Sequence, residues 1–262
     1  MSCKIEKDII SQILNLYQNG VGTMEISSKF GISKFSVRKY LLQNNIILRK
    51  TSAYKNSYNI NYFSEYTIDN CYWAGFISAD GCISGKSRLI IKLAALDEKH
   101  LHKLCIAMNR NLNLIKQKNG QFTFYVSGEK IINDLYYNFD ISNRKTFTSA
   151  FPSKMPEIYW KHFIRGLLDG DGCITFTSCP SIKFTASIGM LDTLRVIFYD
   201  KLSVRLRQKN LYPPIITISE NKLVGEISYS GKNAKLILDW LFSDSENNNR
   251  LERKYNKYLE LF

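Results

Sequence analysis

The sequence predicts an α/β protein of the α+β type, in which two related half-domains follow a small all-α domain. Three observations carry this prediction. An internal repeat spans residues 65–262, each copy alternates helical with extended segments in the order αββαββα, and the first fifty residues show helical periodicity alone. Because 45% of the 262 residues are hydrophobic, the chain can bury a core and does not belong to the disordered class.

We expect four segments along the chain: an all-α domain over 1–50, a linker over 51–64, and half-domains over 65–152 and 153–262. The linker is expected because the sequence there is polar, rich in Tyr and Asn, and only weakly periodic. The N-terminal sequence is charged, and no stretch approaches the roughly 18 consecutive apolar residues of a membrane helix. We therefore expect an intracellular protein whose compartment the sequence leaves open.

The all-α domain is expected to contain three helices. Apolar residues recur at helical spacing before Gly20, and Thr23 is a suitable N-cap for a short second helix. Gly31 and Ser33 then predict a tight turn, in which the Ser33 side chain caps a third helix over 34–43. Two short helices joined by a glycine-containing turn resemble the helix-turn-helix of DNA-binding proteins.

Charge supports a DNA-binding interpretation of this domain. Between residues 4 and 50, eight basic residues against three acidic ones leave a net charge of +5. The alternative is a three-helix packing module whose basic residues are only solvated. The outward positions of the third helix that could contact DNA are Lys34, Ser36, Arg38 and Lys39.

Each half-domain is predicted to begin with a copy of one motif. Residues 73–83 (WAGFISADGCI) align with residues 164–174 (IRGLLDGDGCI), and the acids that both copies share, Asp80 and Asp171, are 91 positions apart. Similar elements follow in both copies. In the first and second copy these are extended runs at 88–96 and 182–188, a helix from near 97 and 192, extended pairs at 112–116 with 122–126 and at 215–219 with 224–229, and a helix over 130–137 and 234–242.

Small residues in the motif predict that the two motif helices pack against each other. Gly75 and Ala79 share one helix face because they are four residues apart, as do Gly166 and Gly170 in the second copy. A face without large side chains allows two helix backbones to approach closely. The two copies are therefore natural partners for each other.

The glycine after each shared acid, Gly81 or Gly172, is expected to end its helix in the left-handed conformation. Asp80 and Asp171 would then lie at helix C-termini, where the helix dipole is already negative and a cation is favoured. If the helices pair, the two carboxylates form an oxygen site suited to Mg²⁺, which can assist phosphodiester hydrolysis. One copy alone would indicate an Asp-Gly turn into a hairpin, but two matching copies favour a functional site.

With these two motifs, residues 65–262 resemble the LAGLIDADG homing endonucleases in their single-chain form. The resemblance implies a saddle of two curved antiparallel sheets in the DNA major groove, and cleavage of both strands with short 3′ overhangs. It also implies a Mg²⁺ or Mn²⁺ site formed by the acids and the residues before them, namely Asp80, Asp171, Ala79 and Gly170. The sequence departs from the family motif at Ser78, which replaces an Asp that position 169 keeps, and at Arg165, which replaces a small residue.

The resemblance further implies a basic residue near the metal-bound water in each half. Each half-domain ends in a similar basic segment, so our candidates are Lys145 and Lys254. A lysine there can orient the attacking water or offset charge that builds on the phosphorane. The alternative is a lysine that contacts only phosphate or solvent.

Residues of the predicted strands and their loops are candidates for DNA contacts. Segments 88–92 and 121–125 alternate apolar and polar residues, as half-buried strands require, and the polar members could read base edges. The basic candidates in the half-domains are Arg88, Lys92, Lys116, Lys118 and Lys183.

Overall charge agrees with a nucleic-acid partner. The 36 Lys and Arg against 23 Asp and Glu leave a net charge of +13 (36 − 23), and polyanions bind such surfaces with counterion release. Anionic membrane is disfavoured because the basic residues are spread along the chain. We therefore favour a monomeric, site-specific endonuclease of extended double-stranded DNA targets, with a non-cutting transcriptional regulator and an RNA maturase on the same scaffold as alternatives.

Overall fold

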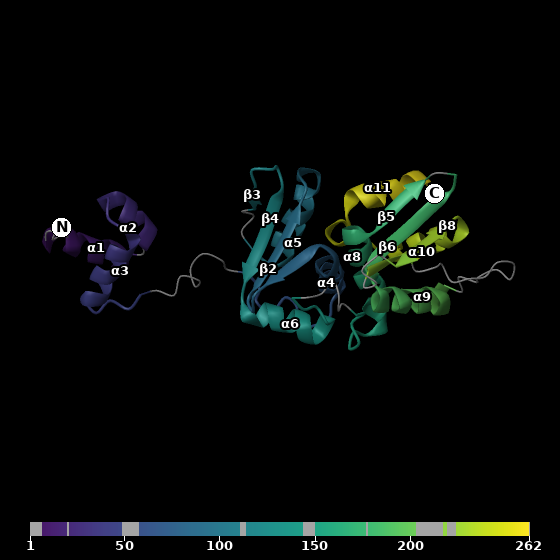
Figure 1. The fold of residues 1–262 in the computed structure, drawn as a ribbon, viewed down its shortest axis with the longest axis horizontal. Helices are drawn as coiled ribbons and strands as arrows, with labels where there is room; N and C mark the ends of the chain where they lie inside the picture. Colours follow the sequence, from purple (N-terminus) through teal and green to yellow (C-terminus); the bar gives the residue numbers. More distant parts are fainter. Residues whose placement is uncertain are drawn as a thin grey trace. The chain divides into compact units, whose positions relative to one another are not determined.

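The chain forms two compact units, Met1–Asn56 and Ser57–Phe262 (Figure 1). The computed structural model describes residues 7–19, 21–48, 58–110, 114–143, 150–176, 178–202, 217–218 and 224–261. Within these ranges, none of the helices combines the length and the apolar character that a membrane span requires.

The first unit contains three helices, α1 (Lys7–Gln18), α2 (Thr23–Phe30) and α3 (Lys34–Gln43). Gly31 ends α2 with a left-handed backbone (φ 64°), which glycine adopts without strain. Their common core contains one or two apolar side chains from each helix, namely Ile13, Tyr17, Ile26, Val37 and Leu41.

Two caps define the helix boundaries around that turn. The Ser33 hydroxyl accepts a hydrogen bond from the Ser36 backbone N–H at 3.0 Å, so Ser33 caps α3 as the sequence predicts. The prediction for Thr23 is wrong. Gly22 occupies the extended cap position (φ −76°, ψ 149°), and Thr23 is already the first residue of α2.

The second unit is built from two copies of one α+β arrangement, which confirms the predicted fold class. The first half contains α4 (Ile68–Asp80), β1 (Gly81–Ser84), β2 (Arg88–Leu93), α5 (Glu98–Ala107), β3 (Ile115–Lys116), β4 (Phe122–Ser127) and α6 (Glu129–Phe139). The second half contains α8 (Trp160–Asp171), β5 (Cys173–Phe176), β6 (Pro180–Ser187), α9 (Ile188–Leu202), β7 (Thr217–Ile218), β8 (Val224–Ser230), α10 (Lys232–Phe242) and α11 (Glu252–Leu261).

Each half forms a four-stranded antiparallel sheet, with strand orders β1-β2-β4-β3 and β5-β6-β8-β7. Burial alternates along the strands: Leu89, Ile91 and Leu93 of β2 face the core, whereas Arg88 and Lys92 are exposed. Helices α5 and α6 pack on the first sheet, and α9 and α10 pack on the second, in both cases against the apolar face (Figure 1). Each sheet therefore presents a second, more polar face.

The second sheet continues into α9 earlier than the sequence suggests. The helix begins at Ile188, directly after β6, and not near Asp192. The Ser187 hydroxyl accepts a hydrogen bond from the Met190 N–H at 3.3 Å, so this serine caps the helix at its earlier start.

The motif helices α4 and α8 form the main contact between the two halves (Figure 1). A Cβ atom on Gly75 would lie 2.0 Å from the Phe163 carbonyl oxygen, and one on Gly166 would lie 2.0 Å from the Tyr72 carbonyl oxygen. The two helix backbones therefore touch directly, and glycine is required at both positions.

The glycines that end the motif helices do not adopt the predicted left-handed conformation. Gly81 (φ −74°, ψ 153°) and Gly172 (φ −86°, ψ 167°) are extended. A Cβ atom on Gly81 would lie 2.6 Å from the Ile77 carbonyl oxygen, and one on Gly172 would lie 2.5 Å from that of Leu168. Glycine is needed here because the chain turns back closely on the last helical turn.

Candidate functional site

The contact between α4 and α8 brings the two acids of the repeat to one place. A Cβ atom on Gly170 would lie 2.3 Å from the Ala79 Cβ and 3.5 Å from Asp80 Oδ2. The Asp80 carboxylate therefore lies beside the residue that precedes Asp171. Asp80 is half-buried and Asp171 is exposed, so both can meet a ligand from solvent.

The groups at these helix ends fit a hard divalent cation. Two carboxylates and the neighbouring peptide carbonyls supply the oxygen ligands that Mg²⁺ prefers, and the carbonyl ends of two helices add negative potential. No cluster of three or more His, Cys, Asp or Glu side chains that could hold a metal occurs in the part of the chain that the structure describes. A cation here would complete its shell with water and substrate oxygens, as Mg²⁺ commonly does.

Lys254 binds the C-terminal end of α8. Its Nζ donates to the carbonyl oxygens of Leu168, Asp169, Gly170 and Gly172 at 2.6, 2.8, 3.2 and 2.7 Å. The residue is only 5% exposed, and its positive charge faces the negative end of the helix dipole. The ammonium group therefore fixes the turn that carries Asp171. Lys145, the predicted counterpart of Lys254 in the first half, lies outside the described residues.

A buried carboxylate lies next to this lysine. Asp169 Oδ2 accepts hydrogen bonds from the Tyr72 hydroxyl at 2.8 Å and from the Leu251 N–H at 2.7 Å. Burial raises the pKa of Asp169 to about 6, with the charge of Lys254 opposing the shift. Burial also lowers the pKa of Lys254, and Asp169 is the main opposing influence. Each group thus stabilises the charged form of the other.

Arg165 is a residue whose role the sequence did not reveal. Its side chain is fully buried, and its Nε and Nη2 donate to the carbonyl oxygen and the Oδ1 of Asn249 at 2.9 and 2.8 Å. Its Nη1 donates to the Leu241 carbonyl oxygen at 2.6 Å. These bonds join α8 to the segment that precedes α11, which delivers Lys254. The sequence did mark this position, because Arg165 aligns with Ala74 of the first copy and so breaks the repeat.

The predicted DNA contacts of the second unit fall on different surfaces. Arg88 and Lys92 lie on the polar face of the first sheet, and Lys183 lies on that of the second. Lys118 lies in the turn between β3 and β4. Lys116 pairs with Phe122, so it belongs to the apolar face, with its Nζ 5.9 Å from the ring centroid of that residue.

The predicted contacts of the first unit lie on α3. Lys34, Arg38 and Lys39 are exposed. Ser36 is half-buried, and its hydroxyl forms a 2.8 Å hydrogen bond with the hydroxyl of Ser33. The same helix exposes 80% of Phe35. The exposed face of α3 is therefore basic with an aromatic side chain at its start.

Comparison with known proteins identifies the fold. No protein-family model and no curated protein sequence matches the chain. Among solved structures, the LAGLIDADG homing endonuclease I-LtrWI bound to target DNA matches with a TM-score of 0.51 at 12% identity, over 78% of this chain and 90% of that one. The second unit has the LAGLIDADG homing endonuclease fold.

Two further structures of this fold match over 75% of the chain with TM-scores of 0.50 and 10% identity. They are the meganuclease I-SmaMI bound to uncleaveable DNA, covered over 88% of its length, and the LAGLIDADG meganuclease I-CpaMI bound to uncleaved DNA, covered over 90%. The LAGLIDADG fold accounts for the paired motif helices and for the two sheets that flank them.

Proposed function

We propose that the chain is a site-specific endonuclease that hydrolyses both strands of an extended double-stranded DNA target and leaves short 3′ overhangs. The observation that carries this proposal is the position of the Asp80 carboxylate against Gly170, beside Asp171, where the two motif helices end. β1 begins one residue after Asp80 and β5 two residues after Asp171, so the polar face of each sheet begins close to one of these acids. The three similar structures were all determined bound to DNA, which supports DNA as the substrate.

In this proposal Asp80 and Asp171 hold divalent cations, Mg²⁺ or Mn²⁺. The backbones of Ala79 and Gly170 belong to the same metal site. The cations would supply the charge that activates water and offsets the leaving oxygen. Lys254 keeps the end of α8 in position, because its ammonium group is bonded to four carbonyl oxygens there. The positive charge of Lys254 also offsets the negative charge of Asp80, and the carboxylate of Asp80 in turn opposes the lowering of the Lys254 pKa by burial.

The first unit would add DNA contacts through the exposed face of α3. Lys34, Arg38 and Lys39 can bind phosphates, and a short helix that follows a glycine-containing turn is the element that helix-turn-helix proteins place in the major groove. The net charge of +5 over residues 4–50 favours this arrangement.

Cleavage of the gene's own flanking DNA, joined without the gene into an uninterrupted site, tests the proposal. We expect Mg²⁺-dependent cutting at one position by the wild type, and loss of double-strand cutting with nearly intact binding in Asp80→Asn and Asp171→Asn. Asp192→Asn is the matched control, because it removes a roughly half-exposed acid from α9, in the half that also carries Asp171. Wild-type turnover by either motif variant would contradict the metal-ligand assignment.

Other outcomes would point to the alternatives. Tight binding of the joined site without cutting in Mg²⁺ or Mn²⁺ would favour a transcriptional regulator. Binding of the surrounding transcript in preference to DNA would favour an RNA maturase.

A further inference from the structure

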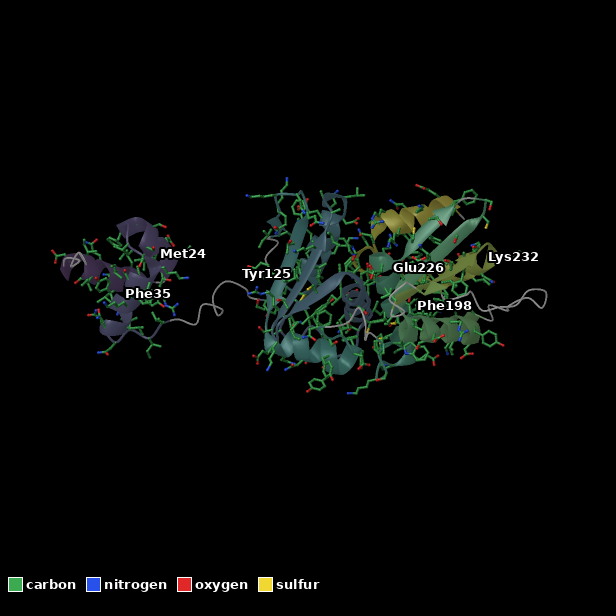
Figure 2. All side chains as sticks on the ribbon, in the orientation of Figure 1. Met24, Phe35, Tyr125, Phe198, Glu226 and Lys232 are labelled. Atoms are coloured by element: carbon green, nitrogen blue, oxygen red, sulfur yellow. The ribbon has the colours of Figure 1, made fainter. Side chains whose placement is uncertain are left out.

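The polar face of the second sheet carries an acid where a DNA-binding surface would be expected to be basic. Glu226 lies on β8 (labelled in Figure 2). It is diagonally across from Lys183 of β6, whose Nζ donates to Glu226 Oε1 at 3.0 Å. The Thr185 hydroxyl lies 3.4 Å from the same oxygen. The side chains of Lys183 and Glu226 are 41% and 42% exposed, so both can also reach a ligand.

The register of the sheet places this pair at its inner end. Lys183 is the partner of Cys173, the first residue of β5, which follows Asp171 and Gly172 directly. Thr175 and Ser181 form the next pair outward on the same face, about 7 Å further along the strands. The Lys183–Glu226 pair therefore lies near the end of α8, where the cleavage centre is proposed.

Stability does not explain the pair. Exposed ion pairs of this kind contribute little to stability, and a carboxylate facing DNA is repelled by phosphates. A hydrogen bond that Glu226 accepts from a base would offset this repulsion. In the major groove, guanine presents two acceptors, N7 and O6, that suit lysine, and cytosine presents an N4 amino donor that suits glutamate.

We infer that Lys183 and Glu226 together read one G·C base pair in the inner part of the second half-site. This inference rests on the proposed function, because it assumes that the polar face of the sheet meets the major groove. The lysine donates to the guanine and the glutamate accepts from the cytosine, so the two side chains match both members of one pair. Their weak mutual ion pair holds them side by side in the free protein.

The first half differs at the equivalent positions. Aligning Cys82 with Cys173 makes Ile90 the counterpart of Lys183 and Thr123 the counterpart of Glu226. Ile90 is half-buried and apolar, and the Thr123 hydroxyl accepts a hydrogen bond from Gln117 Nε2 at 3.1 Å. An apolar side chain favours contact with a thymine methyl group. The G·C requirement therefore applies to the second half-site and not to its mirror position.

Selection of bound duplexes from a random DNA library by the full chain, in EDTA, tests the inference. The wild type should enrich a motif of two half-sites in which one inner position of one half is G·C and the mirror position is not. Glu226→Gln should reduce the preference for G·C at that position about tenfold or more, the scale of one good base contact, and leave the other positions unchanged.

A matched control and a transfer experiment sharpen the test. Asp239→Asn breaks another exposed Lys–acid pair of the same half, on α10, and should leave the motif unchanged. Ile90→Lys, with the buried Thr123 left in place, should create a preference for guanine at the mirror position, and an unchanged mirror position would contradict base reading by the lysine. An unchanged motif with Glu226→Gln would overturn the inference and leave the pair a surface ion pair, whereas enrichment of no two-half motif by the wild type would overturn the proposed function itself.

Discussion

Replacing Gly75 by alanine tests whether the two halves are held together by direct backbone contact. The new Cβ would lie 2.0 Å from the Phe163 carbonyl oxygen, against about 3.4 Å for an ordinary contact, so about 1.4 Å of space is missing. The neighbour is backbone and cannot rotate away, so α4 and α8 must move apart along their contact.

Overpacking of a core usually costs about 1–3 kcal/mol, and a clash with rigid backbone lies at or above the upper end of that range. We expect Gly75→Ala to lower the free energy of unfolding of the second unit by about 3 kcal/mol or more. For a unit of this size, that corresponds to a fall of roughly 6–12 °C in Tm.

Tryptophan fluorescence is a suitable assay because Trp73, Trp160 and Trp240 all belong to the second unit. Gly189→Ala is the matched control: it is a helical glycine with open space around its Cβ position, so alanine should stabilise by up to about 1 kcal/mol. If Gly75→Ala unfolds at the wild-type urea concentration, the close contact of α4 and α8 is not what joins the halves.

Three further predictions concern other parts of the chain. Lys254→Met should slow single-turnover cleavage more than it weakens equilibrium binding, because the end of α8 loses its cap; equal effects on both would refute this positioning role. His162→Gln should reduce the loss of stability on acidification. Burial lowers the pKa of His162 to about 4, with Arg165 adding to the shift, so between about pH 6.5 and 4 the unfolded chain binds a proton that the folded chain does not, and stability falls as pH falls through that window. The free energies of unfolding from urea titrations at pH 5 and 7.5 should therefore differ less in the variant, by roughly 1–2 kcal/mol, and an equal difference would contradict the assignment. Arg38→Glu should lower the slope of log K against log salt by about 1, as expected when one phosphate contact is lost, whereas Lys257→Glu on α11 should have a smaller effect; equal slopes would remove α3 from the DNA interface.

The repeat made the architecture accessible from sequence. Two copies of one motif with small residues four apart predicted a helix pair, and the alternation that follows predicted half-buried strands, while the resemblance to the LAGLIDADG family implied that these strands form two antiparallel sheets. Local patterns were sufficient here, because helix faces and strand faces are set by spacing along the chain.

Long-range contacts were not accessible in the same way. Arg165 bonds to Asn249, 84 positions away, and Tyr72 donates to Asp169, 97 positions away, so neither partner can be inferred from local spacing. The glycines after the acids show a second limit. A glycine can be required because the backbone is left-handed or because a Cβ atom would clash. Only the structure shows that the second reason applies to Gly81 and Gly172.

The contact between α4 and α8 is reciprocal: Gly75 meets Phe163, and the equivalent Gly166 meets Tyr72, the counterpart of Phe163. Such an interface is isologous, the kind that joins two identical subunits about a twofold axis. The helix surface of a single half is thus self-complementary, and duplication followed by fusion of a gene for one half yields a chain of this design. Two copies within one chain can differ in sequence, as Arg165 differs from Ala74 and Ser78 from Asp169, whereas two identical subunits cannot.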